Sequence, residues 1–268
     1  MKQFYTLFAC LFIIATMYAQ PGSLDKSFGQ NGKTLSPFPF SCNALVMQAD
    51  GKILAGGGGG TIKNGDTLRD LITRYNADGS IDIGFGDSGR AVMGTNLGIL
   101  YSPEIAALAV QSDGKIVGAG KIATLPQQTD ILVARFNNDG SIDKGFGDEG
   151  TIRVDLGLAE ITTGIALQDD GKILVSGMKA NYTGSFVSTF TLRFLPDGNV
   201  DNSFGDKGKV LTTGFGLFAQ VHGIGIYQDK IMIGITEYIS QVPHPIQSYV
   251  VLKYLQNGQI DSSYGING

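Results

Sequence analysis

The stretch Leu24-Asp25-Lys26-Ser27-Phe28-Gly29-Gln30-Asn31-Gly32 organises this chain of 268 residues. It recurs four more times, always with an aromatic residue three positions after the aspartate and glycines at the fourth and seventh positions. The five copies, called boxes below, span residues 24–32, 81–89, 142–150, 200–208 and 260–268. Their aspartates are 57, 61, 58 and 60 residues apart (82−25, 143−82, 201−143, 261−201). This spacing predicts a repeat architecture.

A basic residue followed by an aromatic residue precedes each of the last four boxes, eight positions before the aspartate. An ion pair across the turn, with the aromatic of the box as a core anchor, is the structural interpretation. The alternative is a ring of basic side chains around a central channel, which would attract an anion. The structural interpretation assigns the repeat residues as Arg74, Asp82, Phe85, Gly86, Arg135, Asp143, Phe146, Gly147, Arg193, Asp201, Phe204 and Gly205.

An Asp-Gly-Lys tripeptide marks the middle of three repeats, at residues 50–52, 113–115 and 170–172, and is shortened to Asp229-Lys230 in the fourth. Between apolar runs it indicates a hairpin, because glycine supplies the positive φ that the turn needs. No segment after the N-terminus has a sustained helical periodicity. The predicted fold class is therefore all-β: one β-propeller-like domain over residues 20–268, with four repeats of four antiparallel strands.

Closure of the ring is a separate prediction. The strand after the first box, Lys33–Leu35, is expected to complete the sheet of the last repeat and so lock the ring. The alternative is an open arc that closes by pairing with a second chain, which leaves self-association open. A truncated member of a longer surface repeat array is a further alternative.

Residues 1–19 are predicted to be a cleaved signal peptide. Lys2 gives a positive start, Phe4–Met17 is apolar, and Tyr18-Ala19-Gln20 offers a cleavage site. The apolar stretch is shorter than the about 20 residues of a transmembrane helix. We therefore expect a secreted, periplasmic or cell-surface protein without a transmembrane segment.

Composition narrows the function. A net charge of −4 without a dense basic surface argues against nucleic acid. Two histidines and a single cysteine after cleavage, Cys42, give no nucleophile with a base partner, and Cys42 is expected to be buried. We predict no catalytic residue and no cofactor, and expect a non-catalytic module that binds an unknown protein or glycan.

The ligand face is expected to carry the segments that vary most between repeats, residues 57–70, 121–130, 178–188 and 236–248. The glycine run Gly56–Gly60 lacks the Gly-Lys-Ser/Thr ending of a phosphate loop and is predicted to be a flexible blade loop. The alternative function is a propeller-fold lyase or glycoside hydrolase that uses rim carboxylates such as Glu104, Glu160 and Glu237. Clustered, buried carboxylates with raised pKa values would favour that alternative.

The turns before the second and third boxes are candidates for calcium binding. Oxygen-bearing side chains alternate in Asn76-x-Asp78-Gly79-Ser80-Ile81-Asp82 and in its copy at residues 137–143, as they do in calcium loops. Glycine stands at the fourth rather than the sixth place, however, and no glutamate closes the loop. An Asx turn, in which the aspartate bonds its own backbone, is the alternative. The candidate calcium ligands are Asp78, Asp82, Asp139 and Asp143.

The repeat resembles the bacterial delta-60 repeat family. The resemblance rests on Gln-x-Asp-Gly-Lys-Ile followed by Arg-Phe-Asn-x-Asp-Gly-Ser-Ile-Asp-x-x-Phe-Gly-x-x-Gly, best matched by Gln111–Gly150, and it covers residues 22–268. It implies a propeller-like fold in a secreted or cell-surface protein. The molecular function of the family is generally unassigned, so the resemblance implies no activity.

Overall fold

The structure is a computed structural model that describes residues 22–38, 40–63, 66–93, 103–125, 128–181, 186–215, 218–240, 246–266 and 268. The predicted signal peptide, residues 1–19, lies outside these residues. The regular elements of the described part are all β-strands. None of the described residues form a helix that is long and apolar enough to cross a membrane.

The strands form four antiparallel sheets, each a meander in which neighbours in sequence are neighbours in the sheet. The first sheet contains β1 (Phe40–Met47), β2 (Ile53–Lys63), β3 (Asp66–Tyr75) and β4 (Arg90–Met93). The second contains β5 (Pro103–Val110), β6 (Ile116–Leu125), β7 (Gln128–Phe136) and β8 (Thr151–Val154). The third contains β9 (Ala159–Leu167), β10 (Ile173–Ala180), β11 (Phe186–Phe194) and β12 (Lys209–Thr212). The fourth contains β13 (Phe218–Tyr227), β14 (Lys230–Ser240) and β15 (Ile246–Tyr254). The predicted all-β, propeller-like fold class is confirmed.

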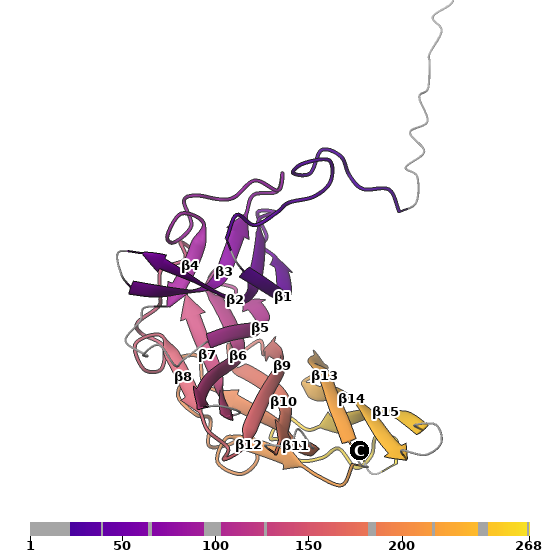
Figure 1. The fold of residues 1–268 in the computed structure, drawn as a ribbon. Coiled ribbons are helices and arrows are strands. Elements are labelled where there is room, and N and C mark those ends of the chain that lie inside the picture. Colours follow the sequence, from indigo (N-terminus) through magenta and orange to yellow (C-terminus); the bar gives the residue numbers. More distant parts are fainter. Residues whose placement is uncertain are drawn as a thin grey trace, which may run out of the picture.

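Each sheet packs face to face on the next, and an apolar core fills each of the three joints. The first strands β1, β5, β9 and β13 contact one another in succession, as the inner strands of propeller blades do. Among the described strands, β13–β15 pack on the third sheet and make no comparable contact with β1–β4. Figure 1 shows the result: the sheets follow one another along an open arc.

The structure corrects the prediction of ring closure by Lys33–Leu35. This segment does not pair with β15. The amide of Gly29 donates to the Asp78 carbonyl at 2.7 Å, and Thr34 Oγ1 donates to the Gly79 carbonyl at 2.6 Å, so the first box and its following segment lie on the first repeat. The last sheet is left with three strands, and the described chain has fifteen strands instead of sixteen.

The mid-repeat hairpins follow their sequence signals. Gly51, Gly114 and Gly171 have φ values of 83°, 84° and 82°, in the left-handed region that glycine adopts freely. In the fourth repeat, which lacks the glycine, Gln228 and Asp229 form a tighter two-residue turn with φ values of 48° and 61°. Two positive φ values fit the right-handed twist of a hairpin, so the shorter turn still joins its strands.

The prediction of variable loops at residues 57–70, 121–130, 178–188 and 236–248 is largely wrong. The strands of each long hairpin continue through most of these segments, and Gly56–Gly60 lies inside β2 rather than in a flexible loop. The glycines serve close backbone approach: a Cβ on Gly57 would lie 1.5 Å from the carbonyl oxygen of Ser41. The glycine run therefore marks a strand in which two backbones approach closely, and it does not mark a loop.

We expect Gly57→Ala to lower the free energy of unfolding by about 1–3 kcal/mol, because β1 must move away from the added methyl group. The matched control is Gly223→Ala in β13, where no atom lies within 4 Å of the new Cβ. That substitution is expected to be neutral or to stabilise by up to about 1 kcal/mol. Urea unfolding measures both, and equal stability of the two variants would contradict the close approach.

Candidate functional site

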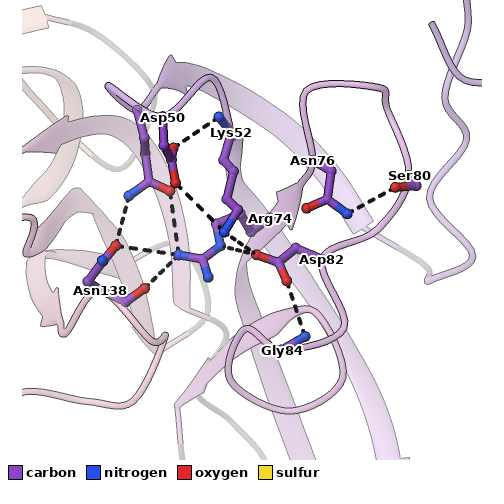
Figure 2. A network of polar contacts seen from close by, with 9 residues as sticks. Asp50, Lys52, Arg74, Asn76, Ser80, Asp82, Gly84 and Asn138 are labelled. Carbon is purple, nitrogen blue, oxygen red and sulfur yellow. Dashed lines mark hydrogen bonds and ion pairs between the residues drawn. The ribbon is translucent and has the colours of Figure 1, made fainter.

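The Arg74 side chain connects two repeats. It is buried at the end of β3, with 7% of its surface exposed. Its Nε donates to Asp82 Oδ2 at 2.8 Å, and its Nη1 donates to the carbonyl of Asn138, in the next repeat, at 2.6 Å. Figure 2 shows the guanidinium between these two groups. The guanidinium carbon also lies 4.3 Å from the ring centre of Phe85, a cation–π contact.

The same arrangement recurs along the arc. Arg135 bonds Asp143 at 2.7 Å and the Pro196 carbonyl, and Arg193 bonds Asp201 at 2.8 Å and the Gln256 carbonyl. A second kind of bond runs from the amide of a box glycine to the turn that follows about 50 residues later in the chain; the four donor–acceptor pairs are Gly29–Asp78, Gly86–Asp139, Gly147–Asp197 and Gly205–Asn257, of which the last three join neighbouring sheets. The three arginines therefore lie buried within protein contacts and do not line a channel.

The aspartates of these ion pairs have lowered pKa values, so they stay ionised at neutral pH. Burial alone would raise the pKa of Asp82, but the nearby positive charges of Arg74 and Lys52 outweigh it and lower that pKa. Asp143 has a lowered pKa for the same reason, through Lys115 and Arg135. At neutral pH the second, third and fourth boxes thus each carry a carboxylate paired with a buried guanidinium.

The four candidate calcium ligands bond to donors of the protein. Asp78 Oδ1 accepts hydrogen bonds from the amide of Ser80 at 2.9 Å and from its hydroxyl at 2.6 Å, and Asp139 does the same with Ser141. These are the bonds of an Asx turn. Asp82 and Asp143 bond instead to the arginines. Calcium binding at these four residues stays a prediction.

The candidate rim carboxylates do not converge. Glu104 forms an ion pair with Lys121 at 3.2 Å, and Glu237 lies on β14 in the fourth sheet. Within the described part of the chain, Glu160 alone of the three belongs to a cluster of carboxylates, with Asp130 from β7 and Asp155 after β8. Glu160 was predicted from the sequence as a rim carboxylate, whereas Asp130 and Asp155 were not. A signal for Asp130 existed: it lies five residues before Arg135, where the next two repeats have Ser188 and Ser248.

The acidic cluster lies at the joint between the second and third sheets. One carboxylate oxygen from each residue lies within 4.8 Å of the others. Asp130 and Glu160 are fully buried, and Asp155 is exposed. The pKa of Glu160 is raised to about 7, mainly by burial. The neighbouring Asp155 and Asp130 carboxylates also raise this pKa, whereas hydrogen bonds from the amides of Leu158 and Leu156 lower it.

The C-terminal face, defined by Tyr249, Val251 and Ile266, is the side of the fourth sheet that turns away from the third. Val250 and Leu252 pack into the joint with the third sheet, so the alternating residues Tyr249 and Val251 point to the opposite side. Val251 is 43% exposed, whereas its equivalents Ile72, Val133 and Thr191 are at most 2% exposed. Tyr249 is 84% exposed, and its equivalents Ile131 and Thr189 are buried.

The last box adds an apolar residue to this face. Ile266 is 96% exposed, at the position where the other boxes have Gln30, Asp87, Asp148 and Asp206. The amide of Gly265, whose four equivalents donate to the turn of a following repeat, has no such acceptor among the described residues.

The N-terminal face, defined by Leu35, Leu45 and Met47, is the complementary side of the first sheet. Leu45 and Met47 are both 69% exposed, whereas their equivalents Leu108, Val110, Ile165 and Leu167 pack into joints. A largely apolar groove of about 570 Å³ crosses this face between the Phe28–Ser36 segment and β1. Cys42, predicted to be buried, is exposed at this groove because no sheet covers it.

Three segments match a family model described as "Domain of unknown function (DUF5122) beta-propeller", over residues 48–85, 111–146 and 168–204. Each begins at the glutamine before the Asp-Gly-Lys hairpin and ends at the aromatic of a box. The chain is built from propeller-type repeats. The match does not carry the delta-60 name, so that resemblance stays a prediction.

No curated protein matches the chain. Among solved structures, the arabinanase of Bacillus subtilis is 10% identical over 78% of this chain and 69% of its own, with a TM-score of 0.40. The α-L-arabinanase of Cellvibrio cellulosa is 11% identical over 82% and 76%, with a TM-score of 0.42. The β-propeller domain of the trilobed protease from Pyrococcus furiosus, which has an open velcro topology, is 12% identical over 85% and 57%, with a TM-score of 0.45. At these identities and scores, the likeness concerns the fold and carries no argument about activity.

We expect Arg135→Ala to lower the free energy of unfolding by about 2–4 kcal/mol, because it removes the bonds of a buried guanidinium to Asp143 and to the Pro196 carbonyl of the next repeat. Asp143 then keeps its ion pair with Lys115. The control is Lys144→Ala, which breaks the pair with Glu149, whose side chains are 73% and 74% exposed. Exposed pairs contribute about 0–1 kcal/mol. Urea unfolding compares the two, and similar losses would show that the repeated arginine does not hold the joint.

The contribution of Glu160 to the stability of the fold changes with pH in the direction opposite to that of the ion-paired aspartates. Its pKa is higher in the folded chain, about 7, than its ordinary value of 4.5, so its protonated form stabilises the fold below pH 4.5 and this stabilisation is lost as the pH rises through about 7. In EDTA, the melting temperature should fall over that window, and Glu160→Gln should reduce the fall. Glu149→Gln, at an exposed residue, serves as the control and should leave the pH profile unchanged.

Proposed function

We propose that the protein is an exported, non-catalytic interaction module that associates head to tail, the C-terminal face of one copy binding the N-terminal face of another. The observation that carries this proposal is the exposure of Val251 and Leu45 at positions that are covered in every internal joint. Exposed apolar patches on a folded domain mark interaction surfaces.

A second copy is the partner that these faces fit best. The internal joints are made by one side of a sheet against the opposite side of the next, and both uncovered sides are present on the same chain. An interface between two different patches of identical chains is heterologous, and it produces rings or open filaments.

The free edge of the last sheet supports the same partner. In the complete sheets a fourth strand pairs with the third, but the described chain provides no fourth strand for β15. An unpaired edge is a template for a strand from another chain. Lys33–Leu35 holds the place after the first box that β4, β8 and β12 hold after later boxes, and Leu35 is 84% exposed. In a head-to-tail pair this segment of the second copy would complete the sheet.

Among the described residues, the acidic cluster is the feature that favours a carboxylate-dependent hydrolase, and its burial weighs against that function. Asp130 and Glu160 have no exposed surface, so a sugar chain cannot reach them in this arrangement. A glycosidase needs its acid and its base or nucleophile on either side of an accessible bond.

Light scattering on size-fractionated protein tests the association. The wild-type chain should gain mass as its concentration rises. Val251→Asp disables one face and Leu45→Asp the other, so each variant alone should stay monomeric while an equimolar mixture should form dimers that do not grow. The matched control is Leu211→Asp on β12, which is 43% exposed like Val251 but lies on neither face. It should assemble as the wild-type chain does.

Two outcomes oppose the proposal. A wild-type chain that stays monomeric up to millimolar concentration does not use these faces for self-association. Assembly that survives in both single variants would place the contact elsewhere on the molecule.

A further inference from the structure

We propose that Asp130, Asp155 and Glu160 form a calcium-binding site at the joint between the second and third sheets. The site goes beyond the association proposed above and does not depend on it. Oxygens that ligate one calcium ion at about 2.3–2.6 Å lie no more than about 5 Å apart. The three carboxylates meet this condition, because one oxygen of each lies within 4.8 Å of the others.

Two unpartnered oxygens point to a bound cation. Asp130 Oδ1 and Glu160 Oε2 are buried and have no hydrogen-bond partner, although both residues are fully buried. A buried carboxylate oxygen without a partner is costly. A divalent cation between them would satisfy both at once.

The other oxygens are held by the protein, which orients the free ones. Arg153 Nε donates to Asp130 Oδ2, and the amides of Leu156 and Leu158 donate to Glu160 Oε1 at 3.2 and 3.3 Å. The amide of Gly157 donates to Asp155 Oδ1 at 2.6 Å. Carboxylates that ligate metals are fixed by outer hydrogen bonds of this kind.

The cluster belongs to one joint only, and the fold does not require it. At the joint between the third and fourth sheets, the residues equivalent to Asp130 and Glu160 are Ser188 and Ala219, which are buried with 3% and 0% of their surface exposed. A small neutral pair therefore fills the same place in the same architecture. The carboxylates at the other joint add charge where packing needs none.

Ligand chemistry selects calcium among common cations. The cluster offers only oxygen atoms, whereas zinc sites are built mainly from cysteine and histidine. The three carboxylates come from separate segments of chain, and calcium accepts irregular geometry better than magnesium does. Asp155 is exposed, so the cluster borders solvent on the side of this residue. Two basic side chains lie beside the cluster: Arg153 bonds to Asp130, and Lys179 Nζ bonds to the Leu156 carbonyl. Three carboxylates against these two positive charges leave the cluster with an excess of negative charge.

Titration of the EDTA-treated full chain with CaCl₂ tests the site, by calorimetry and by thermal melting. At one hundred times the dissociation constant, calcium should raise the melting temperature by about 5–10 °C. The double variant Asp130→Ser, Glu160→Ala copies the neutral pair of the next joint, so it should fold and show no calcium-dependent rise. Asp139→Asn, in a turn outside the cluster, should keep the full rise.

The competing interpretation is that Asp130 and Glu160 share a proton. If calcium gives no heat of binding and does not change the melting temperature of the wild-type chain, the shared proton is favoured and the calcium site is overturned. A rise that persists in the double variant would also overturn it. A rise lost in Asp139→Asn but kept in the double variant would place the ion at the Asx turns instead.

Discussion

The structure depends on a buried guanidinium that reaches two repeats at once. Arg74, Arg135 and Arg193 each bond the aspartate of their own box and a backbone carbonyl of the next repeat, and each lies over the aromatic ring of its box. A guanidinium suits this place because its planar donors bond in several directions while its faces stack on a ring. The rigid spacing of the boxes follows: an inserted residue would move the aspartate, the ring or the amide out of reach.

The repeat chemistry could be predicted from the sequence because it is local. The box, the basic residue before it and the hairpin glycines lie within a few residues of their partners, so spacing alone indicates their contacts. Ring closure could not be predicted in this way, because it depends on how far successive sheets rotate about the axis. Lys33–Leu35 has the sequence of a closing strand, but the box before it bonds to the turn of the first repeat, through the Gly29 amide and the Asp78 carbonyl.

The acidic cluster shows the same limit. Asp130 and Glu160 are thirty positions apart by number, on strands that meet only after two sheets have packed, and Asp155 comes from the connection between them. Alignment of the repeats marks Asp130 as unusual, but it does not show that Glu160 and Asp155 lie beside it. The prediction of a flexible loop at Gly56–Gly60 was wrong for another reason. A run of glycines indicates flexibility by composition, whereas Gly57 is constrained by the Ser41 carbonyl across the sheet. Composition predicts flexibility poorly where two backbones must touch.

The open arc has a consequence for how such a chain changes length. A closed ring fixes the number of its blades, because adding one alters the angle at every joint. In this arc each joint is built from residues of two neighbouring repeats, and among the described strands β13–β15 make no comparable contact with β1–β4. Duplication of a gene segment that runs from one box to the next would therefore insert a sheet together with its arginine, its turn and its core, and leave the existing joints as they are. Length is then free to drift in steps of one repeat, while each end face stays chemically the same.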